Sequence, residues 1–408
     1  MPHPADSPVL VLNCGSSSVR YALLDPGSGR RTASGHAERI GERERGSLTH
    51  QGPDGRHEQR LDLPDQDAAL RAVLDAFADH GPDLAGTGLS AVGHRVVHGG
   101  SLFERPALVD DEVLDAVARQ VPLAPLHNAA SLESLRVARE VLPDVPHVAV
   151  FDTAFHARMP AAAHTYAVPR EWTRDHGVRR YGFHGTSHAY VSREAARLLG
   201  RDPAGTNVIV LHLGNGASAC AVAGGGSVET SMGLTPLEGL VMGTRSGDVD
   251  PALAAHLRRV AGLGSDEVDD ALNRRSGMLA LAGAGDLREV HRRAAGDGEA
   301  AEAARLALEV YCHRVRKYVG AYYAVLERVD AIAFTAGVGE NDAWVRQRSL
   351  RGLERLGIAV DPVRNQAPAD GTRRISPDGG EVAVMVVPTD EEREIAREVV
   401  ALLGAQTP

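Results

Sequence analysis

The same short arrangement of residues occurs twice in this chain of 408 residues, once near the N-terminus and once just past the middle. Each copy is an apolar stretch, a turn containing Asn and Gly, and small residues that lead into a second strand-like stretch. The copies are Leu12-Asn13-Cys14-Gly15-Ser16-Ser17 and Leu213-Gly214-Asn215-Gly216-Ala217-Ser218. A duplication of this kind predicts two similarly folded halves with a cleft between them.

A third glycine-rich segment, Gly337–Asn341, also follows an apolar stretch and predicts a third turn. Glycine lets backbone amides approach a phosphate closely, and a nest of such amides binds anions without lysine. The segment could suggest a dinucleotide motif, but the third glycine is missing and the strand before it lies late in the chain. Three such turns in two repeated halves favour a nucleotide held in an interdomain cleft.

The chain contains a single lysine, Lys317, so 43 of its 44 basic residues are arginine. A Walker-type phosphate loop needs a lysine after its glycines, and a protein kinase needs one on its third strand. Lys317 lies in a stretch with helical spacing, which excludes both families. The formal net charge of −10 argues against a nucleic acid or an acidic membrane as the main partner. An anionic substrate must therefore be attracted by local positive charge.

The cysteine content and the apolar runs indicate the compartment. Cys14, Cys220 and Cys312 are too few and too widely spaced for a disulfide framework or a zinc site. The first residues lack the basic stretch and apolar core of a signal peptide, and the apolar runs have the length of strands rather than of membrane spans. We therefore expect a cytoplasmic protein with reduced thiols.

The spacing of apolar residues predicts strands that alternate with helices. The predicted strands are 9–12, 19–24, 89–97, 145–151, 207–213, 217–223, 227–230, 330–335 and 382–387. The predicted helices are 68–79, 111–118, 129–141, 302–326 and a last helix that ends near 403. Residues 26–66 are polar and predict irregular strands and exposed loops. Thr389 or Asp390 suits the N-cap of the last helix.

Three cationic groups lie in Gly-flanked loops: Arg95, His184 and Arg245. An arginine in such a loop is often a surface or salt-bridged residue, but the apolar residues before Arg245 make simple exposure a weaker explanation. Phosphoryl transfer needs cationic and hydrogen-bonding groups of this kind, because negative charge spreads over the oxygens of the moving phosphoryl group. Catalysis then depends on positioning the reactants and on fixed positive charge.

Two acidic residues stand at the ends of predicted elements. Asp152 follows a strand, and Glu391 lies at the start of the last helix. Asn13 and Glu391 offer the oxygen atoms that magnesium prefers, mostly through water. The alternative for Glu391 is an acidic residue that complements the helix dipole.

Seven segments, in family order and over nearly the whole chain, resemble the acetate kinase family. They are Leu12–Ser18, Gly93–Gly100, Pro122–Asn128, Val150–His156, Tyr181–His188, His212–Ser218 and Phe334–Asn341. The resemblance implies the fold of the sugar kinase, Hsp70 and actin superfamily: an α/β protein of two RNase H-like domains with an interdomain nucleotide cleft. The expected domains are 1–153 with 388–408, and 154–387, the second of which binds nucleotide and dimerises.

The activity implied by the resemblance is the reversible reaction of ATP with acetate to give ADP and acetyl phosphate. The implied cofactor is magnesium, for which manganese can substitute, and ATP is the co-substrate. The implied partners are these small molecules and a second copy of the chain in a homodimer, with no nucleic acid and no membrane.

The resemblance also assigns site residues. It places the metal at Asn13 and Glu391, substrate carboxylate or phosphate at Arg95, transition-state stabilisation at His184 and Arg245, and an essential acidic role at Asp152. The ATP-binding residues that it implies are Arg20, His212, Leu213, Gly214, Asn215, Gly216, Asp286, Leu287, Arg288, Gly337, Val338, Gly339, Glu340 and Asn341. The pocket for the methyl group is Val97, Leu126, Phe183 and Pro236, and the phosphate turn includes Ser16 and Ser18.

Two positions depart from the family pattern. Cys14 stands where the family usually has alanine, a small-for-small change that we expect to be neutral. Arg20 stands where lysine is usual, and the two side chains differ in shape at a phosphate site. Because the chain has replaced lysine nearly everywhere, we interpret Arg20 as compositional drift that keeps the positive charge.

A carboxylate substrate is already ionised at neutral pH, because its free acid titrates near about 4 to 5. It is its own nucleophile and needs no general base, so we expect Asp152 to orient Arg95 or a magnesium-bound water. One alternative is a kinase for propionate or butyrate on the same scaffold, since one methylene in an apolar pocket is worth only about 1–3 kcal/mol. A more distant alternative is a non-catalytic ATP-binding switch of the same superfamily.

Overall fold

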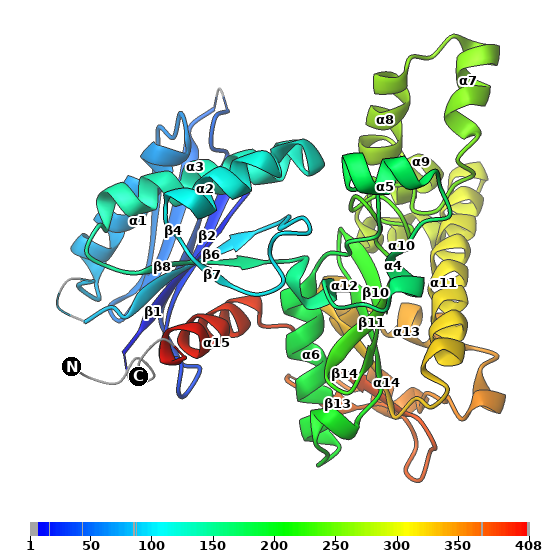
Figure 1. Ribbon diagram of the computed structural model, residues 1–408. Coiled ribbons are helices and arrows are strands. Elements are labelled where there is room, and N and C mark those ends of the chain that lie inside the picture. The colour runs from blue at the N-terminus through cyan, green and yellow to red at the C-terminus, as the bar shows by residue number, and fades with distance from the viewer. Residues whose placement is uncertain are drawn as a thin grey trace. The chain divides into compact units, whose positions relative to one another are not determined.

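The computed structural model describes residues 7–15, 17–42, 44–84, 86, 88–368 and 370–405, with the side chains of 125–127 outside the description. By its internal contacts the chain divides into two compact units, Met1–Ala157 with Asp390–Pro408, and Arg158–Thr389. Each unit is built on one mixed β-sheet with helices on its faces (Figure 1). The assignment of nucleotide binding and dimerisation to the second domain stays a prediction.

The first unit contains an eight-stranded sheet in the order β5-β4-β3-β2-β1-β6-β8-β7. Its strands are β1 (Val9–Cys14), β2 (Ser18–Leu24), β3 (Arg31–Glu38), β4 (Gly46–Gly52), β5 (Gly55–Leu61), β6 (Ala91–Val96), β7 (Ala107–Leu108) and β8 (His147–Phe151). Strands β1 to β5 pair antiparallel, whereas β1, β6 and β8 run parallel. The carboxyl ends of β1, β6 and β8 therefore meet at one edge of the sheet.

Helices cover both faces of this sheet (Figure 1). On one face lie α1 (Gln66–His80), α2 (Asp111–Arg119) and α3 (Pro125–Val141), and on the other lies α15 (Glu391–Gly404). Alternation along β1 explains the two layers, because Leu10 and Leu12 pack with α1 and α3 while Val9 and Val11 pack with α15. A strand buried on both faces needs apolar residues at every position, as β1 has up to Leu12.

The second unit contains a six-stranded sheet in the order β11-β10-β9-β12-β14-β13. Its strands are β9 (Val208–Leu213), β10 (Ala217–Ala223), β11 (Gly226–Thr230), β12 (Ala331–Thr335), β13 (Arg373–Arg374) and β14 (Ala383–Val386). Strands β9, β10 and β11 pair antiparallel, and β9, β12 and β14 run parallel. Nearly every residue of β9, β10, β12 and β14 is buried.

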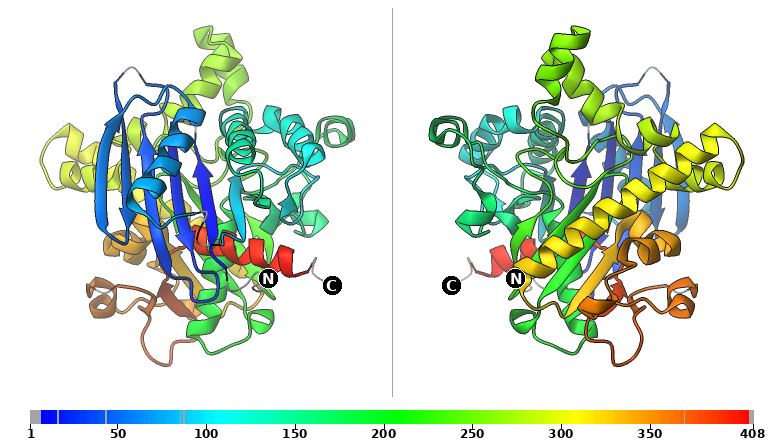
Figure 2. Two further views of the ribbon diagram at one scale, coloured as in Figure 1. Left: turned by 90° about the vertical axis from the view of Figure 1, so that its left-hand side faces the viewer. Right: turned by 90° about the vertical axis from the view of Figure 1, so that its right-hand side faces the viewer.

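Helix α6 (Gly185–Leu198) lies on one side of the second sheet and the long helix α11 (Glu299–Leu326) on the other (Figure 1). The right-hand view of Figure 2 shows α11 running diagonally along this sheet. The remaining helices are α4 (Ala161–His164), α5 (Arg170–His176), α7 (Leu253–Ala261), α8 (Ser265–Arg274), α9 (Gly277–Ala282), α10 (Leu287–Ala294), α12 (Ala336–Asn341), α13 (Ala343–Leu350) and α14 (Pro362–Gln366). Helices α7 to α10 are an insertion between β11 and α11.

The two sheets share one topology, as the duplicated turn predicts. In β3-β2-β1-β6-β8 and in β11-β10-β9-β12-β14, three antiparallel strands are followed by two parallel ones. This is the RNase H-like order, and the predicted α/β fold with two such domains is confirmed. The chain also crosses over: α6 follows β8 in sequence but packs on β9 and β12, whereas α15 follows β14 but packs on β1 and β6.

Two predictions about local structure are wrong. Residues 26–66 form the regular strands β3, β4 and β5, which alternate poorly in hydrophobicity because β5 is an edge strand with mostly exposed residues. Gly337–Asn341 is not a turn but most of helix α12, which Ala336 enters with a φ of 63°. Within the described part of the chain, no helix has both the length and the apolar character needed to cross a membrane.

Candidate active site

Alternation along three strands carries three polar side chains to one edge of the first sheet. The residues that face α15 include Val9, Val11, Ala91, Val148 and Val150. Asn13, Arg95 and Asp152 continue the same alternation at, or one residue beyond, the carboxyl ends of β1, β6 and β8. Because these strands are parallel neighbours, their polar side chains meet on the face covered by α15.

Arg95 is held by two neighbours at this edge. Its Nε donates to Oδ1 of Asp152 at 3.0 Å, and its Nη2 donates to Oδ2 of the same carboxylate at 2.5 Å. Its Nη1 donates to Oδ1 of Asn13 at 3.1 Å. Among the described residues these contacts use three of the five N–H donors of the guanidinium, and two are left for a further acceptor. An anion with two oxygens, such as a carboxylate, fits that pair.

The electrostatics keep Arg95 charged. Burial lowers the pKa of Arg95, but Asp152 and Glu391 outweigh it and raise the pKa above the ordinary value of arginine. The Asp152 side chain is 1% exposed and that of Arg95 21% exposed, so this ion pair is screened little by water while one side of the arginine stays accessible.

Glu391 and Asn13 form the oxygen-rich side of the same edge. Loss of solvation raises the pKa of Glu391 to about 7, with Arg95 opposing and Asp152 adding to the shift. A carboxylate that is hard to ionise beside another carboxylate is a place where a cation is favourable. No cluster of three or more His, Cys, Asp or Glu that could hold a metal occurs among the described residues. Magnesium prefers oxygen donors and keeps waters and phosphate oxygens beside one or two protein ligands, and the side-chain oxygens of Asn13 and Glu391 are donors of that kind.

Arg20 stands directly opposite Asn13 in the antiparallel pairing of β1 with β2, and it is exposed. Opposite residues of an antiparallel pair point to the same face, so Arg20 extends the positive charge of this edge. Cys14 points the other way, where its Sγ accepts a hydrogen bond from Ser134 at 2.9 Å. Burial raises the pKa of the Cys14 thiol to about 11, which keeps it unreactive.

The turn between β1 and β2 is closed by a hydrogen bond from the Gly15 amide to the Ser18 carbonyl at 2.8 Å. The matching turn between β9 and β10 is closed by Gly214, whose amide donates to the carbonyl of Gly216 at 3.0 Å. Ser16, predicted for the phosphate turn, lies outside the described residues. Ser18 is half-buried at the start of β2.

In the second unit, His184 lies over the β9–β10 hairpin. It is the N-cap of α6 and has a φ of 58°, in the left-handed region that is strained for a non-glycine residue. Its ring stacks on that of His212 with centroids 4.2 Å apart and an interplanar angle of 19°. Its Nδ1 lies 2.9 Å from Oγ of Ser218, which pairs with His212 across the hairpin.

Arg245 approaches the same hairpin from the loop after β11. Its Nη1 donates to the Pro236 carbonyl at 2.7 Å, and burial lowers its pKa. A Cβ placed on Gly216 would lie 2.7 Å from Nη2 of Arg245 and 3.6 Å from Nε2 of His184. Glycine at 216 therefore leaves room for the two cationic or donor groups beside the turn.

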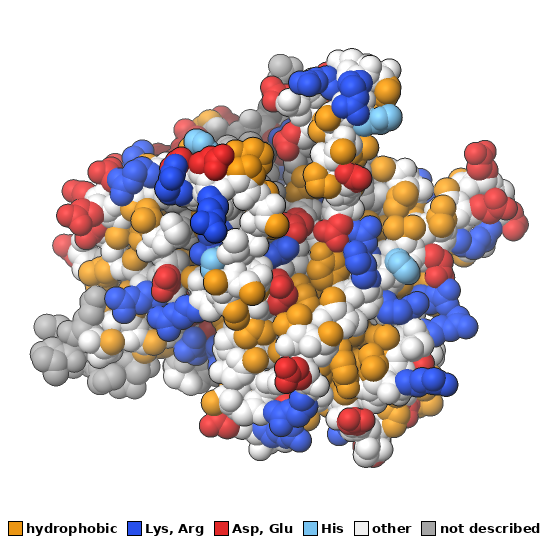
Figure 3. Space-filling view, turned by 45° about the vertical axis from the view of Figure 1, so that its right-hand side comes forward, with side chains coloured by type: hydrophobic (Ala, Val, Ile, Leu, Met, Phe, Trp, Pro, Cys, Tyr) orange, Lys and Arg blue, Asp and Glu red, His pale blue; other side chains and the backbone are white. Residues whose placement is uncertain are grey.

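Positive charge is not gathered into one patch on the face of the molecule drawn in Figure 3. On the face drawn in Figure 3, the Lys and Arg side chains are interspersed with Asp and Glu. Local groups such as Arg95 and Arg245 therefore supply the positive charge that an anionic substrate needs.

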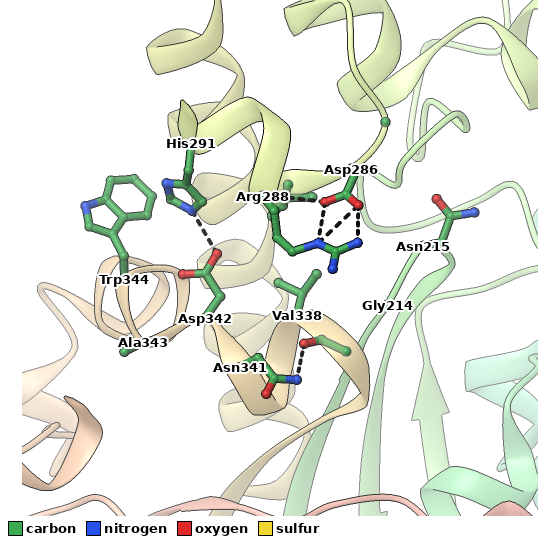
Figure 4. A pocket seen from close by; sticks show the side chains of 13 residues that line it. Gly214, Asn215, Asp286, Arg288, His291, Val338, Asn341, Asp342, Ala343 and Trp344 are labelled. Atoms are coloured by element: carbon green, nitrogen blue, oxygen red, sulfur yellow. Dashed lines mark hydrogen bonds and ion pairs between the residues drawn. The ribbon is translucent and has the colours of Figure 1, made fainter. Parts of the chain in front are cut away.

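A cavity of about 860 Å³ opens in the second unit (Figure 4). The predicted ATP-binding residues that line it are Gly214, Asn215, Asp286, Leu287, Arg288, Gly337, Val338 and Asn341. Its volume falls in the range of small-ligand sites. Hydrogen bonds from Arg288 to Asp286 lower the pKa of that carboxyl to about 2, and Asp286 also caps helix α10.

Five further residues line this cavity that the sequence did not single out: Gly285, His291, Asp342, Ala343 and Trp344. Nε2 of His291 lies 2.8 Å from Oδ2 of Asp342, and the His291 ring meets Trp344 edge to face at 5.4 Å (Figure 4). Helical spacing could have found His291, which lies one turn after Arg288 in α10. Asp342 and Trp344 directly follow the third glycine-rich segment.

The other predicted residues lie around these groups. Leu213, Gly216, Gly339 and Glu340 are not among the residues lining the cavity, and His212 instead stacks on His184. Phe183 is buried and Pro236 half-buried in the second unit, whereas Val97 is buried in the first. Leu126 begins α3, but its side chain lies outside the description.

Three comparisons give this geometry a family context. The family model described as "Acetokinase family" matches residues 8–397. An acetate kinase of Streptomyces coelicolor is 58% identical over 97% of this chain and 97% of its own length.

Two solved structures are also similar. The crystal structure of Porphyromonas gingivalis acetate kinase has a TM-score of 0.91 and 41% identity, covering 97% of this chain and 100% of that one. The structure of a propionate kinase from Francisella tularensis has a TM-score of 0.89 and 40% identity, covering 96% and 98%. With a family match over nearly its whole length and relatives at this level of identity, the chain belongs to the acetokinase family.

Proposed function

We propose that this chain transfers the terminal phosphoryl group of ATP to acetate, reversibly, to give ADP and acetyl phosphate. The observation that carries the proposal is Arg95, which Asp152 and Asn13 fix and which has two N–H donors that no described residue uses. Such a group recognises an anion with two oxygens. Family membership points to the same chemistry.

In the proposed reaction an oxygen of the acetate carboxylate forms a bond to the γ-phosphorus, and the bond from that phosphorus to the bridging oxygen breaks. ADP leaves with the bonding electron pair. No proton has to be removed, because the nucleophile is already ionised near neutral pH. Asp152 therefore acts by orienting Arg95 and not as a general base.

His184 and Arg245 are proposed to stabilise the charge that spreads over the moving phosphoryl group. Both lie beside Gly216, and Arg245 is held by the Pro236 carbonyl. The nucleotide is proposed to bind in the cavity of the second unit, with its base near His291 and Trp344. Magnesium is proposed at Asn13 and Glu391, where it would neutralise phosphate charge when bound; manganese can take its place.

The choice of acid is the finer part of the proposal. The acetate and propionate kinase structures are almost equally similar to this chain, at 41% and 40% identity. The acetate kinases at 55–58% identity favour acetate. The methyl group is proposed to contact Val97, Leu126, Phe183 and Pro236.

The test is a series of acids of increasing length. Purified protein is incubated with magnesium, ATP and acetate, propionate or butyrate, and the acyl phosphate is trapped with hydroxylamine. We expect the highest kcat/KM on acetate, with a fall of about 10-fold or more for each methylene. A higher value on propionate would reassign the substrate, and ATP binding without any acyl phosphate would favour the non-catalytic switch.

We also propose a cytoplasmic homodimer. Its three cysteines are all buried and free, as expected for a reducing compartment. Large apolar side chains such as Trp172, Leu306 and Val325 are exposed on the second unit, which is proposed to dimerise. Sedimentation equilibrium tests the assembly, and a monomer at micromolar concentration would contradict it.

A further inference from the structure

A short chain of hydrogen bonds connects His184 to Ser218 and His188. Nδ1 of His184 lies 2.9 Å from Oγ of Ser218, and the same Oγ lies 2.8 Å from Nε2 of His188. Ser218 and His188 are both fully buried. One hydroxyl therefore bridges two imidazoles at the start of α6.

The fold fixes the three side chains independently of one another. His184 is the N-cap of α6 and His188 lies in its first turn, with the two ring centroids 6.5 Å apart. Ser218 is the second residue of the buried strand β10, where it pairs with His212. Rigid elements therefore hold the bridging hydroxyl, which makes the contact reproducible.

The contact with Ser218 fixes which nitrogen of His184 faces the turn at Gly216. Nδ1 lies on the side of Ser218, whereas Nε2 lies on the side of the turn, 3.6 Å from a Cβ placed on Gly216. Nη2 of Arg245 lies on the same side of Gly216. Nε2 is thus the nitrogen of His184 that faces the turn and Arg245.

A neutral imidazole has one N–H donor and one acceptor nitrogen, and a hydroxyl has a single proton to donate. To stabilise an anionic phosphoryl group, the neutral ring must carry its proton on Nε2. We propose that Ser218 is a positioning residue: it donates to Nδ1 of His184, holds the ring in its Nε2–H form, and accepts a hydrogen bond from Nε2–H of His188. This inference rests on the proposed role of His184 in phosphoryl transfer.

Among the described residues, the titratable groups that face His184 include His212 on β9, His188 on α6 and Arg245 in the loop after β11. Arg245 already brings a full positive charge to this side of the hairpin. The neutral Nε2–H tautomer of His184 gives the site a hydrogen-bond donor without adding a second positive charge.

The direct test is nitrogen-15 NMR of histidine-labelled protein, with the His184 resonances among those of the 18 histidines assigned by their loss in His184→Gln. We expect the Nε2–H tautomer for His184 near neutral pH. Finding the proton on Nδ1 overturns the proposal. The measurement needs neither substrate nor activity, so it stands apart from the test of the proposed function.

The functional test is Ser218→Ala. We expect kcat to fall by about 10- to 100-fold with little change in KM for ATP or acetate, because the partner that orients the donor is lost. The ratio of variant to wild-type activity should rise from about pH 8 to about pH 6, since an imidazolium donates from both nitrogens whatever its partner.

Ser231→Ala is the matched control. Ser231 is also fully buried, and its Oγ accepts from the Ala219 amide at 2.9 Å, so its loss should not alter this ratio. Unchanged kcat in Ser218→Ala, or an equal loss at every pH, contradicts the proposal. If Ser218→Ala does not fold, the tautomer in the wild-type spectrum decides the question.

Discussion

The guanidinium of Arg95 donates to Asp152 through Nε and Nη2 and to Asn13 through Nη1. A side chain held this way loses little further rotamer freedom when it binds a carboxylate. At the scale of single residues, we therefore expect Asp152 to act through Arg95, which it orients.

Asp152→Asn should lower kcat/KM for acetate by about 10²-fold, because the amide loses the charge and half of the fork that aligns Arg95. The measurement is steady-state kinetics with saturating ATP. Asp111→Asn is the control, since Asp111 pairs with Arg139 at 2.9 Å but is 93% exposed. Near-full activity in Asp152→Asn would refute the orienting role.

Arg245→Ala should lower kcat by about 10²- to 10⁵-fold while changing the Kd for ATP only modestly. The reason is that fixed charge beside Gly216 acts on the moving phosphoryl group and not on the bound nucleotide. Rapid-quench kinetics and calorimetry separate the two quantities. Arg364→Ala, which removes a surface partner of Asp378, serves as the control and should leave both unchanged.

The partners of these residues could not be predicted from the sequence. The loops that contain Arg95, His184 and Arg245 stand out by composition, but Asp152 lies 57 residues from Arg95 and Ser218 lies 34 residues from His184. The pairing of β6 with β8 brings Arg95 and Asp152 together, and the packing of α6 on the second sheet brings His184 to Ser218. The resemblance to a family supplied the roles of the residues but not the contacts that hold them.

At the scale of elements, the N-cap of α15 bears both on the stability of the helix and on the position of Glu391 in the candidate active site. Its N-cap is Asp390, whose side chain accepts from the Arg393 amide, which selects one of the two N-caps that the sequence allowed. Asp390 also pairs with Arg31 at 2.5 Å. Because Glu391 is the first residue of the helix, the cap also fixes where that carboxylate lies.

Asp390→Ala should reduce the free energy of unfolding by about 0.5–2 kcal/mol, because the first turn of α15 loses its cap. Asp390→Asn should retain most of that energy, since asparagine caps equally well and a partly exposed ion pair adds only about 0–1 kcal/mol. Urea unfolding midpoints measure the difference. Equal destabilisation by both substitutions would mean that the ion pair with Arg31, and not the cap, dominates.

Elements with apolar periodicity were predicted within a few residues. The long helix predicted over 302–326 is α11 (Glu299–Leu326), and the strand predicted over 217–223 is β10. The sequence does not predict β3 to β5 as regular strands, because pairing with neighbouring strands, and not burial of both faces, stabilises them. The glycines of Gly337–Asn341 suggested a turn, but the segment after β12 is helical.

At the scale of the whole molecule, the two units share one sheet topology but carry different candidate site residues. The first unit carries Arg95, Asp152, Asn13 and Glu391, and the second carries the cavity, His184 and Arg245. The duplication can be seen in the sequence as the two similar segments Leu12–Ser17 and Leu213–Ser218. The distribution of candidate site residues between the two units cannot be seen there. The proposed function assigns the carboxylate of the acid to Arg95 of the first unit and ATP to the second unit.

This division predicts that Arg95→Ala abolishes acyl phosphate formation but not nucleotide binding. The chain has two tryptophans, Trp172 and Trp344, and only Trp344 is among the residues lining the cavity. In a Trp172→Phe background, ATP should change the emission of Trp344 with a Kd within about twofold of that without Arg95→Ala. Trp344→Phe is the control for the signal. Loss of ATP binding in Arg95→Ala would contradict the division.

The most direct test of the central claim follows an oxygen atom from acetate. The protein is incubated with ATP, magnesium and acetate labelled with oxygen-18, and the products are read by phosphorus NMR. We expect ADP, and acetyl phosphate with the label in the bridging oxygen, because the carboxylate attacks the γ-phosphorus directly. Label in AMP, or ATP consumed without any labelled acyl phosphate, would contradict the account.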